Sequence, residues 1–170
     1  LDLTLSEHVE SIFDNYKPDF IINTAGYTNV DLSEINRNIA SKVNVSIVKN
    51  LLKYMPKTTK IIHISSDYIF DGFNSPYSEQ DLPSPINYYG QSKLEAENLI
   101  RSSRKKYIII RTGNLYSQFI NLNSNRLSWI INSLSNNKKI FAADDMISKP
   151  TNTCTIPNLI LSLLPLSDNL

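Results

Sequence analysis

The sequence predicts an α/β fold in which helices cover both faces of an open, parallel β-sheet. Two observations predict this class: short apolar runs alternate with helix-length amphipathic stretches, and small or polar residues follow each apolar run. Such alternation is typical of β-α-β units, whose crossover connections are right-handed. The 170 residues, 41% of them hydrophobic, are enough for one domain with one sizeable core.

The first third of the chain predicts a helix, a strand and a second, longer helix. Thr4 and Glu7 have the spacing of a capping box, so a helix is expected over about 6–16. The apolar run DFIINTAG at 19–26 is expected to form a buried strand that ends in a tight turn. Apolar residues near helical spacing then predict one long helix over about 32–55.

Two further buried strands are predicted with a helix between them. The strands are KIIHISS at 60–66 and KYIIIRT at 106–112, and the helix covers about 87–103. Beyond residue 112 the pattern weakens, and the expected elements are a helix at 126–134, a strand KKIFAAD at 138–144 and a short helix at 156–164. Trp129, the only tryptophan, is expected to belong to the core.

The composition excludes several classes of protein. Seventeen basic residues against sixteen acidic ones give a net charge of +1 and are scattered, which argues against a nucleic-acid partner. With Cys154 as the single cysteine, no internal disulfide or cysteine-based metal cluster can form, and no metal site is expected. No apolar run reaches the roughly 18 residues that span a bilayer, and the N-terminus is unlike a signal peptide. We therefore expect a soluble, cytoplasmic protein without a membrane partner.

In an open parallel sheet, ligands bind beyond the carboxyl ends of the strands. On the helix expected after such an end, Tyr89 and Lys93 are four residues apart and share one face, whereas Tyr88 points about 100° away. A nearby ammonium favours the phenolate and would lower the pKa of Tyr89 from its usual value near 10. The spacing alone carries little weight, because a surface tyrosine beside a solvated lysine has it too.

More specific evidence for a function comes from the order of several longer segments. Together these segments resemble the extended short-chain dehydrogenase/reductases, and most of all the branch that contains dTDP-4-dehydrorhamnose reductase and the regulatory β subunit of methionine adenosyltransferase. They are LDLT, KPDFIINTAGYTNVD, HISSDYIFDG, PYSEQDLPSPINYYGQSKLEAE, IIIRTGNLY and, more weakly, SKPTN. The resemblance implies one Rossmann-like, doubly wound domain over 1–170, without the N-terminal β-α-β unit and its glycine-rich turn and without most of the C-terminal substrate region.

The resemblance also implies roles for particular residues. Tyr89 would be the catalytic acid or base, Lys93 its partner, and Ser66 the hydroxyl that holds the substrate oxygen; strand alternation points the neighbouring Ser65 to the other face. The residues implied in cofactor binding are Asp2, Leu3, Ala25, Gly26, Thr28, Tyr89 and Lys93, and those beside the sugar are Asp67 and Tyr68. Plain turn chemistry for Asp2, a tight turn for Ala25 to Thr28 and a core position for Tyr68 remain alternatives, and His8 and His63 are given no role.

The activity implied is the NAD(P)H-dependent reduction of a nucleotide-diphosphate 4-keto sugar, with dTDP-4-dehydrorhamnose and NADPH favoured. The alternatives are a non-catalytic regulatory or binding subunit and a sugar-nucleotide epimerase or dehydratase. Two departures keep them open: the four glycines form no GxxGxxG turn, and Gly113-Asn114 stands where the reductases carry Ser-Trp. A sheet without the missing unit is expected to expose a strand edge, which a homo-oligomer or a partner chain supplying that unit would cover.

Overall fold

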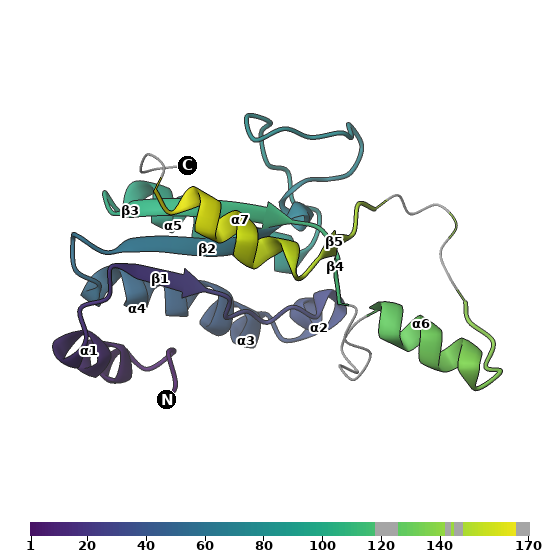
Figure 1. The fold of residues 1–170 in the computed structure, drawn as a ribbon, viewed down its shortest axis with the longest axis horizontal. Coiled ribbons are helices and arrows are strands. Elements are labelled where there is room, and N and C mark those ends of the chain that lie inside the picture. Colours follow the sequence, from purple (N-terminus) through teal and green to yellow (C-terminus); the bar gives the residue numbers. More distant parts are fainter. Residues whose placement is uncertain (118–125, 142–143, 145–147, 166–170) are drawn as a thin grey trace. The chain divides into compact units, whose positions relative to one another are not determined.

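The structure is a computed structural model that describes residues 1–117, 126–141, 144 and 148–165. These residues fall into two compact units, one formed by residues 1–111 and the other lying within 112–166. Figure 1 shows the elements of each. None of the helices in this described part of the chain is long and apolar enough to cross a bilayer.

The first unit is built on a three-stranded sheet. Its strands are β1 (Phe20–Asn23), β2 (Lys60–Ser66) and β3 (Lys106–Thr112), in the order β1-β2-β3 and pointing the same way (Figure 1). β1 pairs with β2 in parallel, with Phe20 opposite Lys60 and Asn23 opposite His63. The predicted α/β class with a parallel sheet is thus confirmed, as are the bounds of β2 and β3.

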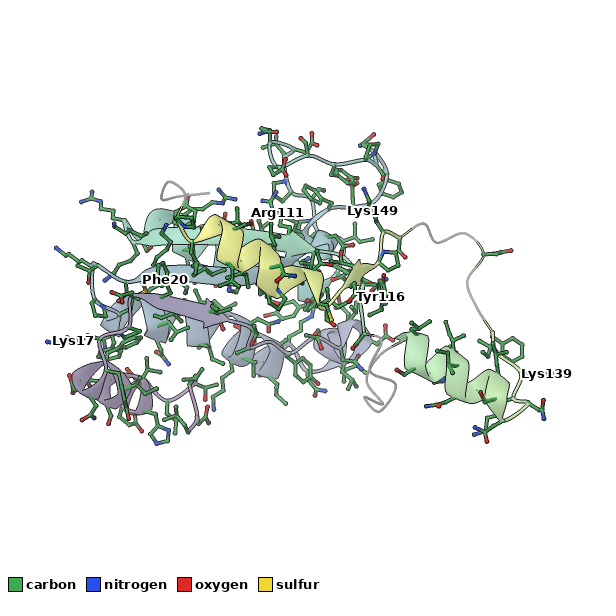
Figure 2. The ribbon with its side chains drawn as sticks, viewed as in Figure 1. Lys17, Phe20, Arg111, Tyr116, Lys139 and Lys149 are labelled. Carbon is green, nitrogen blue, oxygen red and sulfur yellow. The ribbon has the colours of Figure 1, made fainter. Side chains whose placement is uncertain are left out.

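Strand β1 departs from the prediction of a buried strand. It is an edge strand of the described sheet. Phe20 (Figure 2) and Ile22 are 43% and 51% exposed, whereas Ile21 packs against the core. Because successive side chains of a strand point to opposite faces, Phe20 and Ile22 share the open face and Ile21 lies on the packed one. Only one face of β1 therefore contributes to the core.

Three helices form the core with β2. They are α1 (Ser6–Asn15), α4 (Ile47–Tyr54) and α5 (Tyr88–Ser102), and each agrees with a predicted helical region. The buried cluster consists of Val9, Phe13, Ile47, Val48, Leu51, Met55, Ile61, Ala96 and Ile100. Burying each of the larger side chains stabilises the fold by about 1.5–3 kcal/mol.

The predicted capping box at the start of α1 is wrong. The residue before the helix is Leu5, whose side chain caps nothing, and the Thr4 hydroxyl is buried without a hydrogen-bond partner. The Thr4 N–H instead donates to Asp2 Oδ1 at 2.8 Å. Aspartate side chains commonly take a backbone N–H two residues ahead in this way. The helix nevertheless begins at Ser6, as predicted.

The helix predicted over 32–55 is interrupted once, at Asn36, and consists of four segments, of which the last three run on without a break. They are α2 (Val30–Ile35), α3 (Arg37–Ser41), the π-helical segment η1 (Lys42–Ser46) and α4. The break falls at Asn36, whose φ of −112° and ψ of 53° are not helical. Asparagine has a low helix propensity, although the Asn36 side chain makes no capping hydrogen bond here, and a π-helical turn widens the helix locally. Apolar spacing reports neither effect.

The second unit contains β4 (Leu115–Tyr116) paired in parallel with β5 (Thr151–Asn152), α6 (Arg126–Ser135) and α7 (Thr155–Leu163). Both helices were predicted. The strand predicted at 138–144 is absent from the described residues of that range, 138–141 and 144, and its remainder lies outside them. Trp129 is 50% exposed rather than part of the core, because it shares one face of α6 with the polar residues Asn132 and Asn136 around a surface hollow.

The packing of α5 against the sheet can be tested with a matched pair of substitutions. Ile100 in α5 is fully buried and Ile35 in α2 is 76% exposed. We expect Ile100→Ala to lower the free energy of unfolding by about 2–5 kcal/mol, since it leaves a cavity. Ile35→Ala should change it by less than about 0.5 kcal/mol. Urea unfolding measures both, and equal losses would contradict the core described here.

Candidate active site

The carboxyl end of β2 and the first two turns of α5 bring three side chains together. Ser66 ends β2, and Tyr89 and Lys93 lie one turn apart on α5; they are 5%, 8% and 4% exposed. The Ser66 hydroxyl lies close enough to the Tyr89 phenol to lower its pKa. Lys93 Nζ donates to the Ile64 carbonyl of β2 at 2.6 Å. Ser66 and Tyr89 thus lie together at the end of β2, and Lys93 contacts the same strand two residues earlier.

The hydroxyls of Ser66 and its neighbour Ser65 have different surroundings in the structure. Ser66 Oγ accepts from the Tyr68 N–H at 3.2 Å and donates to Asp67 Oδ1 at 3.3 Å, which caps the short 3-10 helix η2 (Asp67–Ile69). Ser65 Oγ is buried and has no hydrogen-bond partner. Ser66 is therefore the hydroxyl that lies beside Tyr89.

The two adjacent tyrosines have different surroundings. The ring of Tyr89 meets the ring of Tyr68 edge to face, with centroids 5.7 Å apart and planes at 73°. Tyr88 instead lies under the guanidinium of Arg37, 5.0 Å from its ring centre, on the side of α3. The difference follows from the 100° between consecutive helical residues.

The start of α5 is fixed by two side chains from outside the helix. The Asn87 side chain accepts from the Gly90 N–H at 2.8 Å, as an N-cap residue does. Glu34 of α2 accepts from the Tyr88 N–H. This hydrogen bond, with a second from Arg37, holds the pKa of the Glu34 carboxyl below its usual value. The backbone around Tyr89 is therefore fixed by hydrogen bonds to Asn87 and Glu34.

Gly90 lets α5 approach the segment after β2, which the sequence reasoning missed. A Cβ at this position would lie 2.0 Å from the Tyr68 carbonyl oxygen and 3.0 Å from Pro85 Cβ. Only glycine fits such a backbone contact. A glycine in the first turn of a helix, directly after the candidate tyrosine, was the available signal.

Asn44, in the π-helical segment, was also missed. It is 2% exposed, its Oδ1 accepts from the Tyr27 N–H at 2.7 Å, and its Nδ2 donates to Ser92 Oγ at 2.8 Å. It thereby ties the segment after β1 to helix α5. A polar residue among apolar ones at helical spacing was the signal, because a buried amide needs partners on both of its sides.

Ionisation of Tyr89 differs from the expectation. Burial raises the pKa of Tyr89 above its usual value; the nearby Ser66 hydroxyl opposes this, and Asp67 and Tyr68 add to it. Burial also lowers the pKa of Lys93 to about 8, with the charge of Glu97 opposing the shift. The predicted lowering of the Tyr89 pKa by Lys93 is not found, because desolvation prevails and the ammonium donates to the Ile64 carbonyl.

Asp67 and Tyr68 lie at the mouth of this group. Asp67 is exposed as a residue, yet partial burial of its carboxyl raises the pKa, against hydrogen bonds from Ser66 and from backbone N–H groups. Tyr68 is half-buried, with its ring on Tyr89. Both can face a ligand that reaches Ser66.

His63 lies deeper, in the middle of β2. It is 1% exposed, and its Nδ1 lies 3.1 Å from the amide nitrogen of Asn23 on β1. Burial, and then the charge of Lys93, lower its pKa to about 3, so the ring is neutral at ordinary pH. This is the packed position expected of a histidine without a catalytic role.

The residues implied in cofactor binding lie in two segments. After β1, Ala25 is half-buried, Gly26 and Thr28 are exposed, and the Ala25 N–H donates to Asn23 Oδ1 at 3.2 Å. A Cβ on Gly26 would come only to 3.5 Å of its nearest neighbour, so the fold itself does not require a glycine there. Small, exposed residues beyond a strand end fit a ligand that crosses the edge of the sheet.

The second segment is the turn before α1. Asp2 is exposed and uses its side chain in that turn, while Leu3 packs against the core and its carbonyl accepts from Asn50 Nδ2 at 3.0 Å. Among the hydrogen bonds of the described residues, none joins Asp2 or Leu3 to Ser66, Tyr89 or Lys93. The turn chemistry that the sequence left open for Asp2 is therefore present.

Parallel strands that alternate with helices along the chain, with candidate polar side chains beyond the end of one strand, are the arrangement of a Rossmann-like α/β protein. The RmlD substrate binding domain family matches residues 1–169, and the chain belongs to this family.

Individual relatives agree with this assignment. A dTDP-4-dehydrorhamnose reductase of Aggregatibacter actinomycetemcomitans is 34% identical over 165 residues, which cover 96% of this chain and 55% of that protein. Methionine adenosyltransferase 2 subunit beta of Rattus norvegicus is 35% identical over 119 residues, which cover 69% of this chain and 36% of that protein. A crystal structure of dTDP-4-dehydrorhamnose reductase from Bacillus anthracis in complex with NADP is similar with a TM-score of 0.89 and 31% identity, over 96% of this chain and 58% of that one. The chain thus spans about half the length of the reductases it matches.

The close contact at Gly90 predicts that alanine at this position destabilises the protein, which is the reverse of its usual effect in a helix. Alanine in place of a helical glycine ordinarily stabilises a protein by about 0.5–1 kcal/mol. Here the new methyl group would meet the Tyr68 backbone, so we expect Gly90→Ala to lower the free energy of unfolding by about 1–3 kcal/mol. Gln91→Ala, at the exposed next position, is the control and should stay within about 0.5 kcal/mol. A stabilised Gly90→Ala variant in urea unfolding would rule out the close approach.

Proposed function

We propose that this chain carries the catalytic group of an NADPH-dependent reductase that acts on a nucleotide-diphosphate 4-keto sugar, dTDP-4-dehydrorhamnose, to give dTDP-rhamnose. The observation that carries the proposal is that Ser66 and Tyr89 lie together at the end of β2, while the buried Lys93, one turn along α5, contacts the same strand. The similarity to dTDP-4-dehydrorhamnose reductases over 96% of the chain supports it. Neither a surface tyrosine nor a solvated lysine would be expected at less than a tenth exposure.

Each side chain has a task in the reduction of a ketone. A bound NADPH would supply hydride to the carbonyl carbon. Ser66 Oγ donates a hydrogen bond to the carbonyl oxygen, where negative charge develops, and Tyr89 gives that oxygen its phenolic proton. The Lys93 ammonium, one turn away on α5, stabilises the phenolate that remains until a solvent proton restores it.

The ionisation of the free site suits the proton-donating role. With its pKa raised by burial, Tyr89 holds its proton throughout the neutral range and is in the form that can donate it. Lys93, with a pKa of about 8, carries its charge below that pH and loses it above. The charge that favours the phenolate is therefore present in the same pH range in which Tyr89 is protonated.

The residues around this group fit the two ligands. We assign the adenine end of NADP(H) to Asp2 and Leu3, its phosphate and ribose side to Ala25, Gly26 and Thr28, and its nicotinamide ribose to Tyr89 and Lys93. Asp67 and Tyr68, at the mouth, would contact the sugar. The edge of β1, which pairs only with β2 in the described sheet, fits a neighbouring strand supplied by a second copy or by another chain.

A second candidate is a regulatory subunit without catalysis. Two observations favour it: the similarity to methionine adenosyltransferase 2 subunit beta, and Gly113-Asn114 in place of the Ser-Trp of the reductases. Such a subunit could keep a nucleotide site and yet turn nothing over.

The adjacent tyrosines provide a matched test in the full-length protein. We expect Tyr89→Phe to lower kcat by about 10²–10⁴-fold, because the proton donor is lost. Tyr88→Phe, under Arg37, should retain kcat within about twofold. The loss of NADPH absorbance with dTDP-4-dehydrorhamnose measures both. Equal losses would contradict the assigned roles, and NADPH binding without turnover in the unmodified protein would favour the second candidate.

A further inference from the structure

Four residues at four-residue intervals form one stripe along α5: Tyr89, Lys93, Glu97 and Arg101. The proposed chemistry uses the first two. Glu97, the third, is 0% exposed, and an ionised carboxylate at such a position is costly unless it is paired and hydrogen-bonded. The stripe therefore continues past the active site into a second buried charge.

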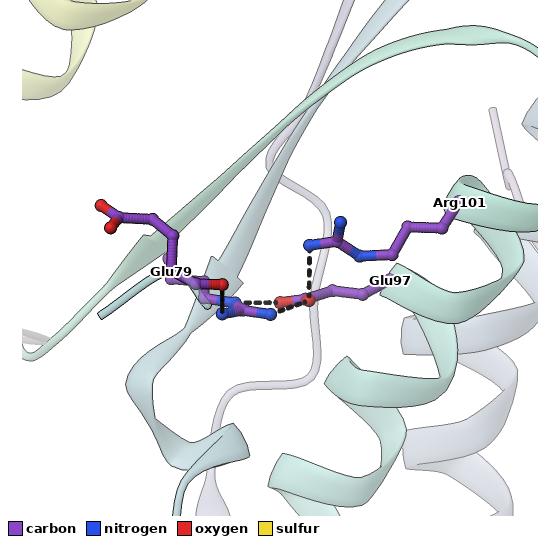
Figure 3. Close-up of polar contacts among 4 residues, drawn as sticks. Glu79, Glu97 and Arg101 are labelled. Atoms are coloured by element: carbon purple, nitrogen blue, oxygen red, sulfur yellow. Dashed lines mark hydrogen bonds and ion pairs between the residues drawn. The ribbon is translucent and has the colours of Figure 1, made fainter. Parts of the chain in front are cut away.

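The partner of Glu97 comes from the end of β3. Arg111 Nε donates to Glu97 Oε1 at 3.1 Å and its NH2 donates to Oε2 at 2.8 Å, as Figure 3 shows. This two-point geometry fixes orientation as well as charge. Arg101 adds a looser contact at 3.7 Å from a side chain that is 45% exposed, against 16% for Arg111.

Arg111 also contacts the loop of residues 70–84. Its NH1 donates to the Glu79 carbonyl at 3.5 Å, and its guanidinium lies 5.3 Å from the ring centre of Phe70, which stacks on Tyr77 at 4.3 Å. The Ser84 N–H closes the loop on the Ile69 carbonyl at 2.9 Å. The loop thus begins directly after the η2 turn that carries Asp67 and Tyr68, at the mouth of the site.

We propose that the Glu97–Arg111 pair is a positioning device for the reaction: it holds the 70–84 loop against α5 and balances the charge around Lys93. This inference rests on the reductase function proposed above. Arg111 links the sugar side of the site to the helix that carries the proton donor, and Glu97 links Arg111 to Lys93. Neither residue touches the reacting atoms, so both act through others.

The two members of the pair act on Lys93 with opposite sign. The titratable groups coupled to Lys93 are Glu97 on α5 and His63 on β2, and His63 is neutral; Tyr89 lies one turn away on α5. Glu97→Gln leaves the Arg111 cation unopposed, which disfavours the ammonium of Lys93. Arg111→Gln leaves the Glu97 anion with only the looser Arg101, which favours it. A purely structural pair would cause similar losses of stability in both variants and no opposed effect on Lys93.

The decisive experiment follows Lys93 directly. In full-length protein labelled with ¹³C-lysine, with Lys93→Met to assign the signal, the Lys93 midpoint is expected near pH 8. We expect it to fall by about one pH unit in Glu97→Gln and to rise by about one unit in Arg111→Gln. Arg101→Gln is the matched control, with little change. Shifts in the same direction, no shift in either variant, or an Arg101→Gln shift as large as that of Arg111→Gln would overturn the proposal.

Steady-state kinetics distinguish the effect of the Glu97–Arg111 pair on the 70–84 loop from its effect on the charge of Lys93. Arg111→Lys keeps the cation but loses the two-point contact and the ring stacking, so it should leave the Lys93 midpoint in place while it raises KM for the 4-keto sugar about tenfold. An unchanged KM would refute the positioning of the loop. The lysine titration needs no turnover, so opposed shifts in a protein without reductase activity would contradict the proposed function and leave the charge coupling standing.

Discussion

The burial of one face of helix α5 against β2 is the constraint from which the rest of the site follows. Along that face the apolar residues Ala96 and Ile100 join the core, while Tyr89, Lys93 and Glu97 carry groups that water would otherwise solvate. Each polar group must then find a partner inside the protein. Ser66, the Ile64 carbonyl and Arg111 are those partners, and they come from the ends of the two strands next to the helix.

The same burial determines the chemistry. Desolvation disfavours charge on Tyr89 and on Lys93 alike, so it moves the two pKa values in opposite directions, up for the phenol and down for the ammonium. The two pKa values, which lie close together in free side chains, are thereby moved apart. This arrangement suits a proton donor, since Tyr89 stays protonated at neutral pH while the Lys93 cation is still present to stabilise the phenolate.

The sequence predicted those parts of the structure whose signals are local. Strands β2 and β3 and helix α5 have uninterrupted apolar patterns, and the structure gives them the predicted bounds or nearly so. The interruption at Asn36 and the turn in which Asp2 takes the Thr4 N–H were not predicted, because neither leaves a mark on apolar spacing.

The candidate site, too, was predictable only where its signals are local in the sequence. Ser66, Tyr89 and Lys93 stand in segments with a recognisable order. The contributions of Asn44, Gly90 and the Glu97–Arg111 pair were not foreseen, because they depend on contacts between elements that are distant in the sequence. Glu97 and Arg111 are 14 positions apart, and only the packing of α5 on the sheet brings them together.

The most direct test of this account is the ionisation of Tyr89 itself. With ¹³Cζ-labelled tyrosine and Tyr89→Phe to assign the signal, NMR can follow the phenol in the protein without cofactor. If burial of the α5 face governs the site, Tyr89 titrates above pH 10, the ordinary value of a tyrosine. A midpoint below 10 would mean that the Lys93 charge outweighs desolvation, and it would contradict the account.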